Sequence, residues 1–173
     1  MNEIIENIKS RRSVRAFDTN KKIAKNDLEQ IVTAAIYAPS GMNRQSWKFT
    51  VVQDQDIIKK LADLIKKELD REDYDFYKPN TLILTSNERD NSNGRDDCSC
   101  ALENMFLAAH SLKIGSVWIN QMKDISDVPE IRAFLDTIKI PQNHIVHGIA
   151  ALGYALEPPK EKPRNLNVIE WIL

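Results

Sequence analysis

Two short runs of residues near the beginning of the chain carry side chains that could bind a ligand. In the first run, Arg11, Arg12, Ser13 and Arg15 come directly after a short predicted helix. Arginine offers a planar fork of donors and serine adds a short one, so these residues could grip a phosphate where helix gives way to extended chain. The residues alone favour a plainer reading, a solvated basic helix end, because a helix C-terminus attracts cations in any case.

The second run is a loop of small residues and amide side chains, containing Pro39, Ser40, Gly41, Asn43 and Gln45. Amide groups on such a loop suit the polar edge of a flat heterocycle. The same residue types also make ordinary turns, so the loop could equally be a turn that ends the preceding helix.

The spacing of apolar residues predicts the elements that position these runs. The first of these helices begins with Asn26 as its N-cap, has Glu29 as the reciprocal partner and stops at Pro39. The sequence predicts further helices over 57–69, 98–112 and 127–135, strands over 47–52, 81–85, 115–119 and 145–155, and loops over 70–80 and 86–96. Residues 1–173 should form one α+β domain in which helices cover an antiparallel or mixed sheet.

Composition narrows the possible functions. The chain has 173 residues, 42% of them hydrophobic, and a formal net charge of -1. Basic residues are scattered among acidic ones, which argues against a nucleic-acid partner. The N-terminus lacks a signal-peptide pattern and the apolar runs are too short to span a bilayer, so we expect no membrane association and a cytoplasmic location.

The two cysteines and three histidines give little support to a metal site. Cys98 and Cys100 are too close together and too few for a tetrahedral site within one chain, and no histidine is near them in sequence. On a helix their thiols would face different sides, and a structural role is expected. His110, His144 and His147 are isolated and are expected to pack or lie at the surface rather than to act as general bases.

Five motifs, in order, resemble those of the FMN-dependent nitroreductase family. They are the two runs above, DCSCALENMFLAAHSLKIGSVW at 97–118, HGIAALGYALEP at 147–158, and the Lys-x-Arg pair at Lys162 and Arg164. The resemblance implies a layered α/β/α sandwich with a mostly antiparallel central sheet. It also implies a homodimer in which the apolar tail, Leu166 to Leu173, is exchanged between subunits and buries Trp171.

The resemblance also assigns roles to the candidate residues. Arg11 and Ser13, with Arg12 helping, would hold the FMN phosphate together with Lys162 and Arg164. Arg15 would lie near the pyrimidine edge of the flavin and stabilise charge that develops on reduction. The loop bearing Pro39, Ser40, Gly41, Asn43 and Gln45 would contact flavin bound mainly by the other subunit, and Trp118, Ile119 and Asn120 would present backbone amides under the ring.

The family implies an FMN-dependent oxidoreductase that uses NADH or NADPH in a ping-pong cycle to reduce a small acceptor such as a nitroaromatic or a quinone. No Gly-x-Gly-x-x-Gly run is present among only five glycines, which excludes a separate Rossmann domain for the nicotinamide. The alternatives are a flavin-binding or flavin-storing module without turnover, a related reductive dehalogenase or enone reductase, and a helical interaction domain without cofactor. Fold alone does not choose between these chemistries.

Overall fold

The computed structural model describes residues 2–173. Within that range helices and short 3-10 segments alternate with strands in the following order: α1 (Glu3–Ser10), α2 (Lys25–Ile36), η1 (Gly41–Asn43), β1 (Trp47–Val52), α3 (Gln55–Glu68), β2 (Thr81–Glu88), α4 (Gly94–Ser111), β3 (Gly115–Ile119), η2 (Gln121–Asp124), α5 (Pro129–Thr137) and β4 (His144–Gly153).

The strands form one antiparallel sheet in the order β1-β2-β4-β3. The continuously apolar start of β2 predicted a central position for this strand, and β2 does pair with β1 on one side and β4 on the other. Strand β3 is at the edge of the sheet, so its outer backbone groups can pair with another segment.

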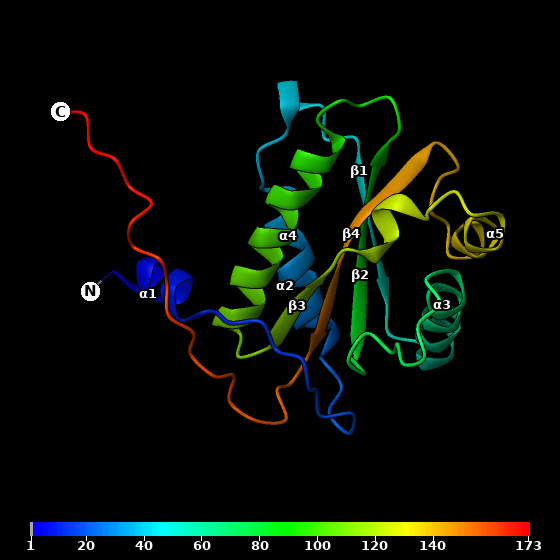
Figure 1. The fold of residues 1–173 in the computed structure, drawn as a ribbon, viewed down its shortest axis with the longest axis horizontal. Coiled ribbons are helices and arrows are strands. Elements are labelled where there is room, and N and C mark those ends of the chain that lie inside the picture. The colour runs from blue at the N-terminus through cyan, green and yellow to red at the C-terminus, as the bar shows by residue number, and fades with distance from the viewer. Residues whose placement is uncertain (1) are drawn as a thin grey trace.

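Helices cover both faces of the sheet (Figure 1). Helices α2 and α4 pack on one face, where Leu102 and Met105 are fully buried. Helices α3 and α5 cover the other face, where Leu61 and Ile65 are buried. This arrangement confirms the predicted α/β/α sandwich with an antiparallel sheet, and it follows from a sheet that carries apolar side chains on both sides.

The predicted cap of α2 is wrong. The helix begins at Lys25, its N-cap is Ala24, and no side chain caps it. The carbonyl of Ala24 accepts hydrogen bonds from the backbone N–H groups of Asp27 and Leu28, at 3.1 and 3.2 Å. Asn26 therefore lies inside the first turn, where its side chain cannot act as the N-cap.

Strand β2 extends beyond its predicted end, and α4 begins earlier than predicted. Ser86 and Asn87 belong to β2 and are completely buried, because the strand continues to pair with β4 after an irregularity between Thr85 and Ser86. Their polarity predicted a loop. The polar start of α4, from Gly94 to Asp96, falls within the same predicted loop. The ends of α3, α5 and β4 differ from prediction by one or two residues.

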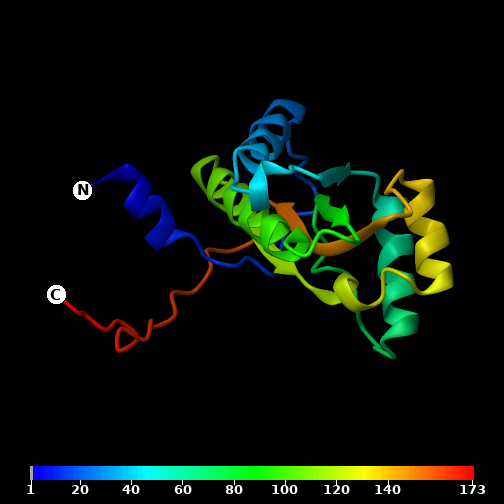
Figure 2. The same cartoon turned by 90° about the horizontal axis from the view of Figure 1, so that it is seen from above.

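Helix α1 and the C-terminal tail project from the same side of the body (Figures 1 and 2). No residue of α1 is buried, and the tail from Leu166 to Leu173 is exposed throughout. Trp171, for example, is 73% exposed. A single chain therefore does not bury the tail, and its exchange with a partner stays a prediction. Among the described residues, no helix has the length and apolarity needed to cross a membrane.

Burial of His144 makes stability depend on pH. Its ring Nδ1 lies 3.1 Å from the Ser86 hydroxyl oxygen, and burial, assisted by Lys48 and Arg132, lowers its pKa below the ordinary value. The unfolded chain therefore takes up the proton first as pH falls, so this contribution to stability is present above about pH 6.5 and is lost as the solution becomes more acidic.

We predict that the free energy of unfolding falls between pH 7.5 and pH 5.5, and that His144→Asn reduces this fall. Asparagine can still hydrogen-bond to Ser86 but does not titrate. Urea unfolding at both pH values measures the effect, which amounts to about 1.4 kcal/mol for each unit by which the two pKa values differ. Identical pH dependence in the variant and the parent would contradict this role of His144.

Candidate functional site

A cavity of about 150 Å³ brings together most of the predicted phosphate-binding residues. Its lining consists of Arg11, Arg12, Ser13, Arg15, Lys160, Lys162 and Arg164. Residues separated by about 150 positions in sequence therefore meet in one place. The cavity contains six side chains that carry positive charge and one hydroxyl, a composition suited to an anion.

The edge of the sheet positions the first half of this cavity. The backbone N–H of Val14 donates to the carbonyl of Ser116 at 2.9 Å, and Ser13 forms a parallel bridge with Ser116. Val14 is buried beside Gly115, where an added Cβ would come within 2.8 Å of its side chain. The segment that carries the arginines is thus fixed along β3, and a larger residue at Gly115 would displace it.

The same segment also fixes the beginning of the tail. Phe17 bridges Ala155, and the backbone N–H of Leu156 donates to the carbonyl of Ala16 at 3.0 Å. The tail therefore leaves the sheet beside the arginine segment. This pairing explains why the basic residues of the tail reach the cavity.

The side chain of Arg12 is only partly satisfied. One guanidinium nitrogen, Nη2, lies 2.9 Å from Oε1 of Glu161, and Nη1 donates to the backbone carbonyls of Lys9 and Arg11. Its Nε atom is buried and has no hydrogen-bond partner among residues 2–173. A buried donor without a partner is costly, so this nitrogen favours an acceptor nearby.

Few acidic groups offset the charge in the cavity. The Glu161 side chain is 85% exposed, and Glu103 approaches Arg11 only to 3.8 Å. Exposed pairs of this kind contribute little. A phosphate, which carries about two negative charges and several acceptor oxygens, therefore fits this donor set in both charge and hydrogen bonding.

Lys160 is a cavity residue that sequence reasoning missed. Lys160, Lys162 and Arg164 alternate with other residues in a segment without helix. Side chains two positions apart share a side of an extended chain. The alternation therefore indicates that Lys160 lies on the same side as Lys162 and Arg164, whereas the Lys-x-Arg motif includes only the last two.

Arg15 lies with the predicted phosphate-binding residues rather than apart from them. It was predicted to reach the flavin ring, but it lines the same cavity as Arg11 and Ser13. The structure therefore does not separate a phosphate end from a ring end among these residues. Because Arg15 is exposed whereas Arg11 and Arg12 are half-buried, its guanidinium is the freest of these three to extend beyond the cavity.

The amide loop is not part of this cavity. Residues 39–45 lie at the N-terminal end of α4, whereas the arginine segment pairs with Ser116, beyond the other end of this helix (Figure 1). Met42, Asn43, Arg44 and Gln45 are exposed there. The Gln45 amide donates to the Asn43 side-chain oxygen at 2.8 Å, which links two of the predicted ligand residues to each other.

The end of β3 presents one backbone donor at the sheet edge. The carbonyl of Ser116 points away from β4, because it accepts the N–H of Val14. In an antiparallel ladder the backbone groups of every second residue point the same way, so the N–H of Trp118 also points away from β4. Ile119 is buried, and the N–H of Asn120 is taken by the Gln121 side chain at 3.1 Å. Among Trp118, Ile119 and Asn120, Trp118 is therefore the residue whose backbone N–H points out from the sheet edge.

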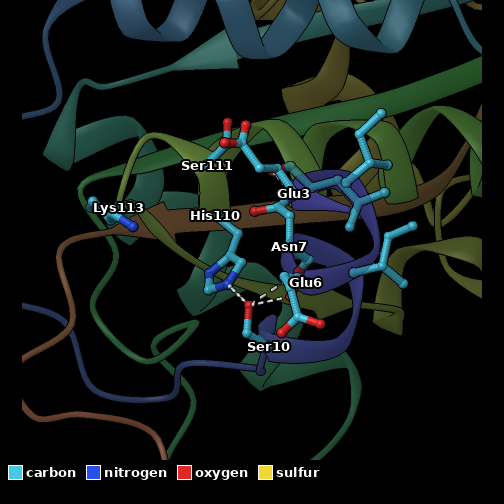
Figure 3. A pocket seen from close by; sticks show the side chains of 10 residues that line it. Glu3, Glu6, Asn7, Ser10, His110, Ser111 and Lys113 are labelled. Atoms are coloured by element: carbon cyan, nitrogen blue, oxygen red, sulfur yellow. Dashed lines mark hydrogen bonds between the residues drawn. The ribbon is translucent and has the colours of Figure 1, made fainter. Parts of the chain in front are cut away.

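A larger cavity of about 590 Å³ lies between α1 and the C-terminal part of α4 (Figure 3). The side chains of Ser10 and His110 form a polar pair in this cavity, with their Oγ and Nε2 atoms 2.9 Å apart. The Ser10 hydroxyl donates to the Glu6 carbonyl at 2.6 Å, so its proton is not available to the histidine. Ser10 therefore accepts from His110, the reverse of what activates a serine nucleophile.

The two cysteines lie in different surroundings on α4. Cys98 is buried and Cys100 is exposed, so the thiols face different sides of α4 as expected. Burial raises the pKa of the Cys98 thiol to about 12, which keeps it protonated and unreactive. Within residues 2–173 no group of His, Cys, Asp and Glu side chains is arranged to hold a metal ion.

Comparison with known proteins connects this geometry to a family. A model of the nitroreductase family matches residues 8–81 and 75–154. A protein of Archaeoglobus fulgidus, provisionally named NADH dehydrogenase/NAD(P)H nitroreductase, is 32% identical over 169 residues, covering 94% of this chain and 89% of the relative. A more distant relative, the iodotyrosine deiodinase of Thermotoga neapolitana, is 25% identical and covers 94% of both chains.

Among solved structures, a nitroreductase with bound FMN from Bacteroides fragilis superimposes with a TM-score of 0.95. It is 42% identical to this chain, and the match covers 100% of both chains.

We predict that the cavity binds inorganic phosphate and that Arg11→Ala weakens this binding. Loss of one charge-assisted contact costs about 1.5 to 3 kcal/mol, or roughly tenfold to a hundredfold in affinity. Isothermal titration with phosphate at low salt measures the change. Lys59→Ala, which removes the same charge from the exposed face of α3, is the control and should bind phosphate like the parent. Equal affinity in Arg11→Ala would remove Arg11 from the site.

Proposed function

The chain belongs to the nitroreductase family, and from this premise we propose that it is an FMN-dependent NAD(P)H oxidoreductase that reduces small acceptors such as nitroaromatics and quinones. FMN, when bound, would supply the redox chemistry of a ping-pong cycle in which NADH or NADPH is the reductant and the small acceptor the oxidant. We propose that residues 1–173 act as one FMN-binding domain.

The cation-lined cavity is the observation that carries this proposal. Arg11, Arg12 and Ser13 on one segment and Lys162 and Arg164 on the other would hold the FMN phosphate, with Lys160 as an additional donor. The unpartnered Nε of Arg12 would gain an acceptor when the phosphate binds. Phosphate binding thereby replaces repulsion among cations with charge-assisted hydrogen bonds.

Two further groups of this chain would act on the flavin ring. Trp118 would offer its outward backbone N–H from the edge of β3. Arg15 would stabilise the negative charge that gathers at the pyrimidine edge on reduction, which is preorganised electrostatic stabilisation of the kind that accelerates charge-forming steps. Since Arg15 is exposed beside the cavity, its side chain is able to turn toward a ring that lies along β3.

We propose that the active unit is a homodimer. Leu166, Trp171 and Ile172 are 79%, 73% and 94% exposed on a single chain, as is the apolar Ile4 of α1 at 69%. Apolar side chains gathered on two projecting segments favour an interface. The amide loop, Pro39 to Gln45, lies away from its own chain's cavity and would contact flavin bound by the partner.

We also propose a cytoplasmic location. The free thiols of Cys98 and Cys100 are compatible with a reducing compartment.

Stopped-flow absorbance tests the proposed activity and the role of Arg15 together. We predict a yellow protein that NADPH bleaches and that a quinone or nitroaromatic restores. In Arg15→Ala, oxidised FMN should bind with only a modest loss, while bleaching slows roughly a hundredfold to a thousandfold, because removal of a preorganised charge partner costs about 3 to 4 kcal/mol at the transition state.

Other outcomes of this experiment favour the alternatives. A yellow protein that NADPH does not bleach would indicate a flavin-storing module, and a colourless protein that cannot be loaded would exclude FMN binding. If Arg15→Ala bleaches at the parent rate with an unchanged midpoint potential, Arg15 does not tune the flavin. Equal loss of FMN affinity in Arg15→Ala and Arg11→Ala would place Arg15 on the phosphate.

The tail generates a separate prediction about assembly. Truncation after Asn165 removes Leu166 to Leu173 and should dissociate the dimer, because an obligate interface buries on the order of 2,000 Å² or more and the tail supplies its large apolar residues. Trp171→Phe should stay dimeric, whereas Trp171→Asp should not. Sedimentation velocity measures both. A stable, flavin-loaded dimer after truncation would rule out tail exchange.

A further inference from the structure

A network of buried polar side chains lies where α4 begins. Asp97 is 4% exposed, Asn91 is 6% exposed and Asn87 is completely buried. The Asn91 amide donates to Asp97 Oδ2 at 3.1 Å and to Ser46 Oγ at 3.1 Å, and the Ser46 hydroxyl donates to Asn87 Oδ1 at 2.7 Å. Buried polar groups of this kind are retained only when they are hydrogen-bonded, so the network fixes the segments that it joins.

Asp97 is the charged member of this network. Its Oδ1 accepts the backbone N–H of Gly41 at 2.8 Å, while its Oδ2 accepts from Asn91. None of the ion pairs found within residues 2–173 involves Asp97. The carboxylate is instead stabilised by N–H dipoles and by its place in the first turn of α4, where negative charge is favourable. Replacement of Asp97 would leave the Gly41 N–H without this acceptor.

The network holds the amide loop at Gly41 and at Ser46, the residue that follows the loop. Asp97 binds the loop at Gly41, and Asn87 and Asn91 bind it at Ser46. There is no room for a side chain at Gly41, because an added Cβ would lie 2.3 Å from the Asn93 amide nitrogen. The loop is therefore packed directly against the beginning of α4.

Between Gly41 and Ser46 the backbone is strained. Met42, Asn43 and Gln45 have φ angles of 53°, 54° and 50°. Left-handed conformations cost about 1 to 3 kcal/mol at non-glycine residues and persist only where surrounding contacts impose them. Asp97 provides such a contact, and the strained residues point into solvent, where they are free to meet another molecule.

We propose that Asp97 is a positioning residue that holds the amide loop in the conformation needed to complete the flavin site of the partner subunit. This inference rests on the proposed function. Asp97 and Ser111 lie about 20 Å apart along α4 at 1.5 Å per residue, and the arginine segment is attached at Ser116, beyond Ser111. In the proposed dimer, Asp97 of one subunit would serve the FMN held by the other.

Asp97→Ala and its neighbour Asp96→Ala are a matched pair. Both remove one carboxylate from the first turn of α4, but Asp96 is exposed and makes no contact with the loop in the hydrogen bonds of the described residues. In flavin-free protein, hydrogen exchange at residues 40–46 should accelerate about tenfold or more in Asp97→Ala and stay unchanged in Asp96→Ala. Unchanged exchange in Asp97→Ala would show that the carboxylate does not hold the loop.

Subunit mixing tests which site the loop serves. Chains carrying Arg11→Ala and Asp97→Ala, with different affinity tags, are co-expressed and the heterodimer is purified. One of its sites combines the intact cavity of the Asp97→Ala chain with the intact loop of the Arg11→Ala chain. We expect about one FMN per heterodimer, although each variant alone should bind FMN at least about tenfold more weakly than the parent.

The control places both substitutions on one chain and pairs it with a parent chain. Each site then contains one damaged part, so we expect almost no bound FMN. The opposite pattern, with FMN in the control and none in the mixed dimer, would show that the loop serves its own chain and would overturn the proposal. FMN content is measured by absorbance after denaturation and needs no turnover.

Asp97→Asn keeps the test decisive if Asp97→Ala does not fold. Asparagine retains one acceptor but places a donor against either Gly41 or Asn91, so we expect an intermediate loss of FMN and the same mixing pattern. A parent protein that binds no FMN would refute the proposed function, and hydrogen exchange would still decide whether Asp97 holds the loop.

Discussion

Mutual repulsion among six cationic side chains in one small cavity is the constraint on which this structure depends. The cavity has a volume of about 150 Å³. It is lined by three arginines of the N-terminal segment and by three basic residues of the tail, namely Arg11, Arg12, Arg15, Lys160, Lys162 and Arg164. The exposed Glu161 pairs with Arg12. Like charges so close together oppose folding unless an anion joins them or solvent screens them. The fold keeps them together because backbone pairing, rather than side-chain attraction, brings their two segments into contact.

That pairing is a property of the sheet edge. Strand β3 accepts the arginine segment at Ser116, and the same segment accepts the start of the tail through Ala16 and Phe17. The helices on the two faces bury the sheet and leave this edge accessible (Figure 2). The predicted binding residues are thus held by backbone pairing at the sheet edge, while the tail beyond them carries apolar residues that a single chain does not bury.

The sequence was most informative where local chemistry determines local structure. Apolar periodicity predicted β1 and β3 with their observed bounds, and the Arg-Arg-Ser and Lys-x-Arg motifs predicted residues that do share a cavity. It was least informative where tertiary contacts override polarity. Ser86 and Asn87 looked like loop residues because their hydrogen-bond partners lie far away in sequence, so neither the length of β2 nor the network at the start of α4 could be predicted. Lys160 is different, because it alternates with Lys162 and Arg164 in the sequence and this pattern is enough to predict its place beside them.

A crystal structure of the protein grown with FMN tests the central claim most directly. We expect a phosphate within hydrogen-bond distance of Arg11, Arg12 and Ser13 on one side and of Lys162 or Arg164 on the other, with the Nε of Arg12 donating to it. We also expect the ring to lie along the free edge of β3. FMN bound elsewhere, for example in the cavity between α1 and α4, with the cation-lined cavity containing only solvent, would contradict it.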